Sequence, residues 1–580
     1  MDSKQKIQQH LSFLYGEQHA ELLTEQLWEK LTAFQEIYSA PEYRGPSHRL
    51  SEMDAILISY GDMVQRNGDK PLKVMAEFLN THLEGVINIV HILPFFPYSS
   101  DDGFSVIDYK QVNPNWGDWS DVKNIANHFD LMFDVVVNHI SQFSKWFEEY
   151  KKGNPDYANY FITIDPGTDL SDVFRPRALP LLTKVDTVSG EKWVWTTFSA
   201  DQIDLNFANP AVLFEVLAIF LFYISQGARC IRLDAIAFIW KEIGTNCLHL
   251  PQVHCIVELI RTVLDVVAPH VVLITETNVP HEENISYFGD GKNEAQMVYN
   301  FSLPPLVLHS IQTGDGEKLM RWAKTLEQKT DQVTFFNFLA SHDGIGLLPA
   351  RGILNDDEIN ALAEHTLAMG GRVSYKNNSD GSKTPYEMNI NYLDATRPAD
   401  KEESVEKIAN RFLASQSIMM ALRGVPGIYY HSLLGSQNWV EGMVASRQNR
   451  TINREKLDVD LLNQELKDSK SLRHFVFEGF KKFLCVRQNH SAFDPHGGQE
   501  VIDQNPAVFG VKRISRDQAE NIICLTNVSN EPQVVFLDND DMPENWMSLG
   551  DLLGSGFSFQ RGGSLHVELA PYQVCWLLIK

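Results

Sequence analysis

Three carboxylates in this 580-residue chain each follow a short apolar run: Asp234 in the segment RLD, Glu276 in ITE and Asp343 in SHD. Cleavage of a glycosidic bond with retention needs two carboxylates that face each other. One attacks the anomeric carbon, and the other protonates the leaving oxygen and later takes the proton of the incoming nucleophile. These residues can do such chemistry only if the fold brings the ends of their runs together.

An arginine precedes the first of these carboxylates. Arg232 lies two residues before Asp234, and alternate residues of a strand share one face. Its guanidinium is therefore expected beside the carboxylate, where a positive charge favours the ionised form. We expect Arg232 to keep Asp234 ionised and nucleophilic.

Eight short runs rich in aliphatic and β-branched residues alternate with longer amphipathic stretches after about residue 53. The predicted strands are 55–60, 86–93, 131–137, 229–233, 271–275, 297–301, 334–339 and 427–430. Several are apolar on both faces, as in parallel strands covered by helices. The pattern predicts an α/β fold, a (β/α)8 TIM barrel, whose active site lies at the carboxyl ends of the strands.

Four of the predicted strands end on polar residues, which are Asn138 with His139, Asp234, Glu276, and His342 with Asp343. The start of a solvated loop explains one or two such positions. All four together favour a common pocket at one end of the barrel.

Other regions are expected to lie around this barrel. Residues 1–50 predict an N-terminal helical extension, because leucines repeat there at helical spacing. The barrel is assigned to residues 51–139, 207–343 and 411–499, with insertions at 140–206 after the third strand and at 344–410 after the seventh. Residues 500–580 predict a small antiparallel β domain, with strands at 507–514, 521–527, 533–537 and 565–569.

The composition narrows the range of partners. Lys and Arg number 50 and Asp and Glu 75, a net charge of −25, which disfavours nucleic acid and anionic membrane surfaces. Six cysteines lie far apart without a CxxC pair, as in a protein that keeps reduced thiols. No signal peptide or apolar run of membrane-spanning length is seen. We expect a soluble cytoplasmic protein, monomeric or homodimeric, that acts on small molecules.

Four segments follow one another in the order that a known family shows: DVVVNH at 134–139, RCIRLDAIAF at 229–238, VLITETN at 272–278 and FLASHDG at 338–344. They resemble the conserved regions of glycoside hydrolase family 13, the α-amylase family, and the resemblance covers roughly residues 54–455. It implies that Asp234 is the nucleophile, Glu276 the acid/base and Asp343 a stabiliser of the transition state.

Further segments resemble the sucrose-phosphorylase-like subfamily: HILPFFPYSSDDGFSVIDY at 91–109, FRPRALPLLT at 174–183, WTTFSADQIDLN at 195–206, GVPGIYYHSLLGSQN at 424–438 and NRTINRE at 449–455. The resemblance implies a glycosyltransferase-type phosphorylase that uses inorganic phosphate as co-substrate and no cofactor. The substrate-binding residues that it implies are Asp101, Phe104, His139, Phe198, Gln202, Arg232, His342, Tyr386, Glu387 and Arg450.

Phosphorolysis also needs a group that binds phosphate. Water outcompetes phosphate for a glucosyl-enzyme unless the phosphate is held, and Arg175 and Arg177 could hold a dianion with charge-assisted hydrogen bonds. The resemblance points to Arg177. The alternative is that the two arginines only cap a surface loop.

The acceptor segment departs from true sucrose phosphorylases, which carry Tyr-Gln where this chain has Tyr386 and Glu387. With the N-terminal extension and the SSDDGF spelling, this resembles the branch acting on glucosylglycerol and glucosylglycerate. A glycerate carboxylate needs a cation, and Lys383, the basic residue near Glu387, would be weakened by that glutamate. We therefore predict phosphorolysis of 2-O-α-glucosylglycerol to α-glucose 1-phosphate and glycerol. Glucosylglycerate and sucrose or its 6-phosphate are the alternatives, and a plain α-glucosidase or transglucosidase is a more distant one.

Two groups of residues bear on whether the protein binds a metal. Cys247, His249, His254 and Cys255 cluster after the fourth strand, but their spacing matches no standard site and core packing is favoured. Many relatives in the family bind calcium near the position of Asn138, yet the resemblance implies none in this branch. We predict no metal. A catalytically inactive binding subunit is disfavoured because all three carboxylates are present.

Overall fold

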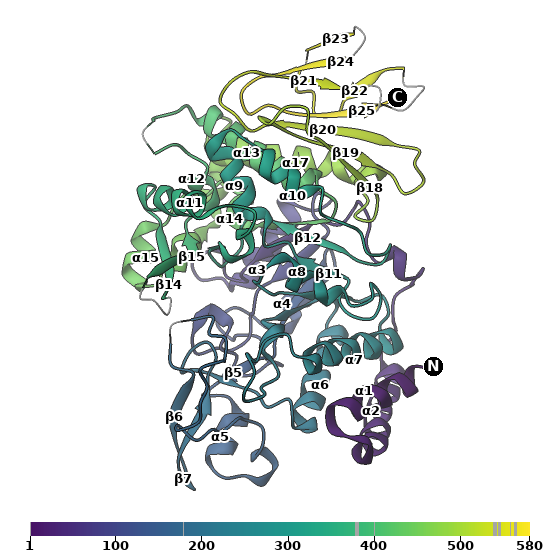
Figure 1. The fold of residues 1–580 in the computed structure, drawn as a ribbon, viewed down its shortest axis with the longest axis vertical. Helices are drawn as coiled ribbons and strands as arrows, with labels where there is room; N and C mark the ends of the chain where they lie inside the picture. Colours follow the sequence, from purple (N-terminus) through teal and green to yellow (C-terminus); the bar gives the residue numbers. More distant parts are fainter. Residues whose placement is uncertain are drawn as a thin grey trace.

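Eight parallel strands close into a barrel at the centre of the molecule (Figure 1). The computed structural model describes residues 2–177, 179–377, 382–399, 401–537, 542, 547–556, 558–561 and 565–580. Around the barrel, the strands are β1 (Ile56–Ser59), β16 (Val425–Tyr429), β12 (Thr334–Phe338), β11 (Met297–Tyr299), β10 (Val272–Thr275), β9 (Ala228–Asp234), β4 (Asp130–Val136) and β3 (Ile89–Ile92). Each coincides with a predicted strand, so the prediction of a TIM barrel is confirmed.

The barrel forms because its strands are buried on both faces and helices cover the outside. Apart from Asp130 and Arg229, the residues of these strands are buried, as expected of parallel strands under a helical layer. The covering helices are α3 (Pro71–His82), α4 (Trp119–Ala126), α6 (Pro210–Ser225), α7 (Pro251–Val267), α8 (His281–Ile285), α9 (Leu303–Thr313), α10 (Glu317–Ala323), α13 (Val405–Ala421) and α17 (Leu472–Gln488).

Strand register places the charged residues at one level of the barrel. Arg232 of β9 lies opposite Asp134 of β4 and Ile274 of β10, and Asp234 lies opposite Val136. Residues at equal level on neighbouring strands point to the same face. Arg232 and Asp134 therefore meet inside the barrel, one step below Asp234.

Two insertions cover the carboxyl ends of the strands. The first carries β5 (His139–Ser141), α5 (Lys145–Lys151), β6 (Leu182–Thr187), β7 (Gly190–Trp195) and β8 (Gln202–Asp204), and it extends to the lower left of Figure 1. The second carries β13 (Ile345–Gly346), α11 (Asp356–Ala368), β14 (Arg372–Asn377), β15 (Lys383–Asn389) and α12 (Tyr392–Ala395). β13, β15 and β14 form one antiparallel sheet.

Short elements follow the last barrel strand. They are α14 (Tyr430–Leu433), α15 (Val440–Ser446), the 3-10 helix η7 (Asn449–Asn453), β17 (Leu457–Asp458) and α16 (Val459–Lys467). β17 pairs with β2 (Val64–Gln65), which ties this segment back to the loop after β1.

The two ends of the chain form separate additions. The helices α1 (Ser3–Tyr15) and α2 (Glu17–Ile37) pack beside α7, as Figure 1 shows at the lower right. At the other end lie two antiparallel sheets, one of β18 (Gly498–Ile502), β19 (Val508–Ile514), β20 (Asn521–Asn527), β25 (Val574–Ile579) and β22 (Leu549–Asp551), the other of β21 (Gln533–Leu537), β24 (Leu565–Leu569) and β23 (Ser558–Arg561). The predicted C-terminal β domain is confirmed, although the sequence pattern missed β18, β22, β23 and β25.

Within the described residues, none of the helices combines the length and apolarity that crossing a bilayer requires.

Candidate active site

A cleft of about 990 Å³ opens at the carboxyl ends of the barrel strands, between the two insertions. Of the predicted site residues, all except Arg232 line it, and Arg232 lies buried beneath its floor. The structure thus brings together, from all along the chain, the residues Asp101, Phe104, His139, Arg175, Arg177, Phe198, Gln202, Asp234, Glu276, His342, Asp343, Tyr386, Glu387 and Arg450.

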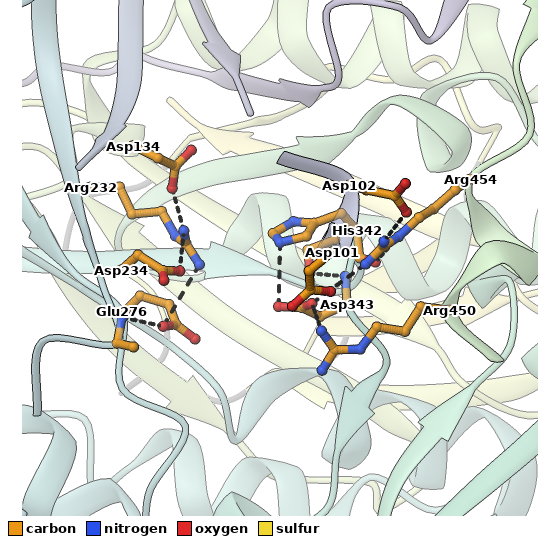
Figure 2. A network of polar contacts seen from close by, with 12 residues as sticks. Asp101, Asp102, Asp134, Arg232, Asp234, Glu276, His342, Asp343, Arg450 and Arg454 are labelled. Atoms are coloured by element: carbon orange, nitrogen blue, oxygen red, sulfur yellow. Dashed lines mark hydrogen bonds and ion pairs between the residues drawn. The ribbon is translucent and has the colours of Figure 1, made fainter. Parts of the chain in front are cut away.

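Asp234 lies at the end of β9 and shares one guanidinium with a deeper carboxylate. Nη1 of Arg232 donates to Oδ1 of Asp234 over 2.9 Å and also to Asp134 (Figure 2). Oδ2 of Asp134 in turn lies 2.6 Å from Nε2 of His91. Arg232 and Asp134 are almost completely buried. The guanidinium therefore cannot rotate away, and it holds Asp234 in place from below.

Glu276 lies on the other side of the same guanidinium. Its Oε2 accepts a hydrogen bond of 3.1 Å from the backbone N–H of Ala235 and lies 3.7 Å from Nη2 of Arg232. Ala235 has a left-handed backbone with φ of 49°, which is uncommon for a residue other than glycine. This turn directs the backbone N–H that follows Asp234 toward Glu276.

The two carboxyl groups share one electrostatic environment. Burial raises the pKa of Asp234 and that of Glu276, and their proximity to each other and to Asp343 adds to the effect. Arg232 opposes both shifts, and it lies closer to Asp234 than to Glu276. Since two adjacent buried carboxylates resist double ionisation, the pair retains a proton, and the shorter contact with Arg232 favours that proton on Glu276.

Asp343 has the opposite setting. Burial alone would raise its pKa, but the positive charges of Arg450 and Arg454 hold the pKa well below the ordinary value. Nη1 of Arg450 donates to Oδ1 of Asp343 over 2.5 Å, and Nη2 of Arg454 lies 3.8 Å away. Asp343 is therefore a permanent negative charge beside the pair that shares a proton. Figure 2 shows Asp234 and Glu276 with Arg232 on the left, and Asp343 with Arg450 and Arg454 on the right.

Arg450 also binds the second insertion. Its Nε and Nη2 donate to the two carboxylate oxygens of Glu387 on β15, over 3.2 and 2.6 Å. Gly344, next to Asp343, makes the approach of β15 possible, because a Cβ there would lie 2.5 Å from Cγ of Glu387 and 2.7 Å from the carbonyl oxygen of Met388. Glu387 is thus held in a fork-shaped pair by Arg450, whose one positive charge it shares with Asp343.

Aromatic and neutral polar groups complete this side of the cleft. The rings of Phe104 and His342 stack with centroids 4.7 Å apart, and burial lowers the pKa of His342 to about 3. Burial likewise lowers the pKa of His139, whose Nε2 lies 3.0 Å from Nε2 of Gln202. Both imidazoles are therefore neutral at neutral pH, and suit hydroxyl groups rather than anions.

Asp101 joins this side of the cleft to the first insertion. Nη2 of Arg177 donates to Oδ2 of Asp101 over 3.0 Å, and the guanidinium lies over the ring of Phe198 at 5.6 Å. Burial would raise the pKa of Asp101, but Arg177, Arg450 and Arg454 lower it overall. The backbone of Asp101 is left-handed, with φ of 53°.

Two further cations line the outer part of the cleft. Arg175 and Lys376 are exposed, and the ammonium of Lys376 lies 5.4 Å from the ring centre of Phe174. Within the described residues, neither side chain has a carboxylate at ion-pair distance. Lys383, which the sequence analysis considered for a carboxylate, is also exposed but does not line the cleft.

The residues around Asn138 do not fit calcium. Nζ of Lys241 lies 2.6 Å from Oδ2 of Asp204 and donates to Oδ1 of Asn138 over 2.8 Å. A buried ammonium therefore already supplies the positive charge that these oxygens would offer to a cation.

Sequence reasoning missed several residues that support the site. Asp134 and His91 anchor Arg232, Asp102 pairs with Arg454, and Tyr60 packs edge-on to His342. Asp134 was within a quoted segment, where its period-two spacing from the strand end could have shown that it faces the barrel interior. Asp102, the partner of Arg454, lies 352 residues away in the sequence, and no sequence pattern predicts that the two side chains meet.

Known proteins resemble this chain over most of its length. A profile described as "Alpha amylase, catalytic domain" matches residues 84–366. Glucosylglycerate phosphorylase of Spirochaeta thermophila is 51% identical over 100% of this chain and 99% of its own length, and that of Escherichia coli is 42% identical over 99% and 100%. Glucosylglycerol phosphorylase of Marinobacter adhaerens is 28% identical over 76% of this chain and 88% of its own. The crystal structure of sucrose 6F-phosphate phosphorylase from Thermoanaerobacter thermosaccharolyticum superposes with a TM-score of 0.72 at 24% identity, covering 83% of this chain and 95% of that one.

Proposed function

The chain belongs to the α-amylase family, glycoside hydrolase family 13, as an enzyme of the sucrose-phosphorylase group, and we propose that its substrate is α-glucosylglycerate, which it cleaves with inorganic phosphate to α-glucose 1-phosphate and glycerate. The observation that carries the choice of acceptor is the likeness, over essentially the whole chain, to glucosylglycerate phosphorylases. The predicted substrate, glucosylglycerol, is not confirmed, since the relative of that name is far less similar.

The geometry supports an anionic acceptor. The sequence disfavours glycerate as acceptor only if Glu387 is a free negative charge beside Lys383. In the structure Glu387 is not free, because Arg450 pairs with it through two hydrogen bonds, whereas Lys383 lies outside the cleft. Lys376, seven residues earlier and on the neighbouring strand, lines the cleft instead. A glycerate carboxylate entering the cleft thus meets Arg175 and Lys376, which face no carboxylate at ion-pair distance among the described residues, and a glutamate that is already paired with Arg450.

In the first step, Asp234 attacks the anomeric carbon while Glu276 donates its proton to the glycosidic oxygen. Arg232 holds the attacking carboxylate at 2.9 Å, and the N–H of Ala235 orients the acid. Glycerate leaves as the protonated alcohol, and the glucosyl group stays attached to Asp234. The fixed charge of Asp343 faces the positive charge that develops on the sugar ring.

In the second step, phosphate attacks the glucosyl-enzyme and Glu276 takes up its proton. Arg177 contacts Asp101 in this structure, while the resemblance implies that Asp101 binds glucose hydroxyls. The sugar would then replace Arg177 on Asp101 and free the guanidinium for phosphate. Two inversions at carbon return the α configuration.

The choice of substrate is tested by phosphorolysis of a panel of glucosides. Purified protein is incubated with phosphate and α-glucosylglycerate, α-glucosylglycerol, sucrose or sucrose 6-phosphate, and release of glucose 1-phosphate is measured. A charge-assisted contact contributes about 1.5–3 kcal/mol, so kcat/KM for glucosylglycerate should exceed that for glucosylglycerol roughly 10- to 150-fold. A higher kcat/KM for any other member of the panel would overturn the proposal.

A further inference from the structure

A second cleft, of about 1130 Å³, lies where the N-terminal helix α1 packs against α7 on the outside of the barrel. Among the residues that the structure describes, it shares none of its lining with the active-site cleft. His10 reaches it from α1, and Cys255 and Glu258 reach it from α7. Residues three apart in a helix are neighbours on its surface, so the two α7 side chains face the same imidazole.

The three potential ligand atoms are spaced as around one metal ion. Nδ1 of His10 lies 3.5 Å from Sγ of Cys255 and 3.6 Å from Oε2 of Glu258, and all three atoms lie within 4.8 Å of one another. Zinc bonds of about 2.0–2.3 Å in a tetrahedron separate neighbouring ligand atoms by roughly 3.3–3.6 Å. The ligand atoms therefore need little rearrangement to bind one ion.

A neighbouring amide fixes the carboxylate of this group. Oε1 of Glu258 accepts a hydrogen bond of 2.5 Å from Nδ2 of Asn293, which leaves Oε2 directed at His10. Sγ of Cys255 lies 3.7 Å from the carbonyl oxygen of His10 as well as 3.5 Å from its Nδ1, so the thiol is directed at the same point.

The other residues of the cluster considered in the sequence analysis do not join this site. Nδ1 of His249 lies 2.9 Å from the hydroxyl of Tyr287, and His254 pairs with Glu294 at 3.0 Å. Cys247 contacts the carbonyl oxygen of Glu242. The sequence pattern grouped four residues near in sequence, whereas the fold selects one of them and adds a histidine from α1.

We propose that His10, Cys255 and Glu258 bind a zinc ion that joins the N-terminal helices to the barrel. A thiolate, an imidazole and a carboxylate suit zinc, whereas calcium and magnesium prefer oxygen ligands. On binding, Cys255 releases its proton to solvent, and a water molecule completes the tetrahedron. The ion would hold α1 on α7, remote from the catalytic carboxylates, and so would stabilise the fold without taking part in turnover.

The test uses the full-length protein freed of metal with a chelator. Zinc is titrated against a chromophoric competitor, and cobalt is used as a spectroscopic substitute because its bond to a thiolate gives a charge-transfer band. We expect one equivalent to bind, a cobalt–thiolate band, and a thermal midpoint that rises with added zinc while kcat stays constant. Binding without a thiolate band, or no saturable binding, would contradict the proposal.

Matched variants locate the ion. Cys255→Ser and His10→Ala should each lower zinc affinity by more than about tenfold. Cys485→Ser, which changes an exposed thiol, and His19→Ala, which changes an exposed imidazole on α2, should leave the affinity unchanged. Equal affinity in Cys255→Ser and Cys485→Ser would place the ion elsewhere. If Cys255→Ser does not fold, protection of Cys255 from alkylation by zinc in the wild-type protein decides the question.

Discussion

The two sides of the active-site cleft balance their charges in opposite ways. On the glucosyl side, where the cleft floor holds the catalytic carboxylates, Asp234 contacts the buried Arg232 of its own strand, and Asp343 contacts the half-buried Arg450 of η7. On the acceptor side, Arg175 and Lys376 are exposed and, in the described part of the chain, face no carboxylate at ion-pair distance. The first side has its ion pairs before substrate binds, whereas the cations of the second have no carboxylate partner among the described residues and are open to an anionic ligand.

This difference separates two tasks. A transition state with positive charge on the sugar needs fixed negative charges that do not reorganise during the reaction. The acceptor side must instead bind phosphate and the proposed glycerate in turn, and both are anions. The comparison predicts that changes on the glucosyl side abolish turnover, whereas changes on the acceptor side shift the preference among acceptors.

The largest effect is expected at the carboxylates that share a proton. Asp234→Ala removes the proposed nucleophile and Glu276→Gln the proposed acid, so each should lower the rate of glucose 1-phosphate release by at least about 10³-fold. Thermal midpoints near that of the wild type would show that the fold persists. Near-normal turnover in either variant would contradict the prediction that changes on the glucosyl side abolish the reaction.

Arg177 lies between the two sides, and its replacement should affect the second substrate. Arg177→Ala should raise the KM for phosphate and lower phosphorolysis roughly 10- to 150-fold, because a charge-assisted contact is lost. Arg177→Lys should restore only part of the activity, since an ammonium lacks the paired donors of a guanidinium. The ratio of free glucose to glucose 1-phosphate is measured at several phosphate concentrations. An unchanged ratio in Arg177→Ala would place the phosphate elsewhere, with Arg175 the next residue to replace.

A smaller effect is expected from an exposed lysine of the acceptor side. Lys376→Met should lower kcat/KM for glucosylglycerate by about tenfold and leave that for glucosylglycerol nearly unchanged. The loss should shrink at high salt, which screens an exposed charge. Lys383→Met is the matched control, because Lys383 lies outside the cleft. Equal effects of the two substitutions would show that Lys376 does not contact the acceptor.

The smallest effect concerns pH. Burial raises the pKa of Glu276 above 4.5, so this residue keeps its proton at higher pH than an ordinary carboxyl group. The rate of the first step should fall as pH rises through that raised pKa, because the ionised form cannot protonate the leaving oxygen. With α-glucosyl fluoride, whose leaving group needs little protonation, this basic limb should weaken. If the rate falls equally at high pH with α-glucosyl fluoride and with glucosylglycerate, the decrease is caused by a group other than Glu276.

The glucosyl side could be predicted from the sequence because its residues end barrel strands. Eight apolar runs set the fold, and the fold then brings Asp234, Glu276 and Asp343 to one rim whatever the intervening loops contain. The C-terminal domain was recognised for a similar reason, from alternating short strands. Strand β25 was missed although Pro571 and a turn precede its apolar run, because the run does not alternate between apolar and polar residues.

The acceptor side could not be predicted in the same way. Whether Glu387 repels the carboxylate of an acceptor depends on Arg450. This arginine lies 63 residues away in the sequence, and only the folded chain brings the two side chains together. Closeness in the sequence also pointed to the wrong lysine. Lys383 is close to Glu387 along the chain, but it lies outside the cleft. Whether a charged loop residue attracts or repels a ligand depends on its tertiary partners, and a sequence motif does not contain these.

The central claim is that the glucosyl group on Asp234 is transferred to an anionic acceptor, and its most direct test is capture of the glucosyl-enzyme. Wild-type protein is supplied with α-glucose 1-phosphate and equal concentrations of glycerate and glycerol, and the initial rates of the two glucosides and of free glucose are measured. The account predicts that glucosylglycerate forms roughly 10- to 150-fold faster than glucosylglycerol, with the advantage falling as salt rises. Equal rates, or faster formation of glucosylglycerol, would contradict it.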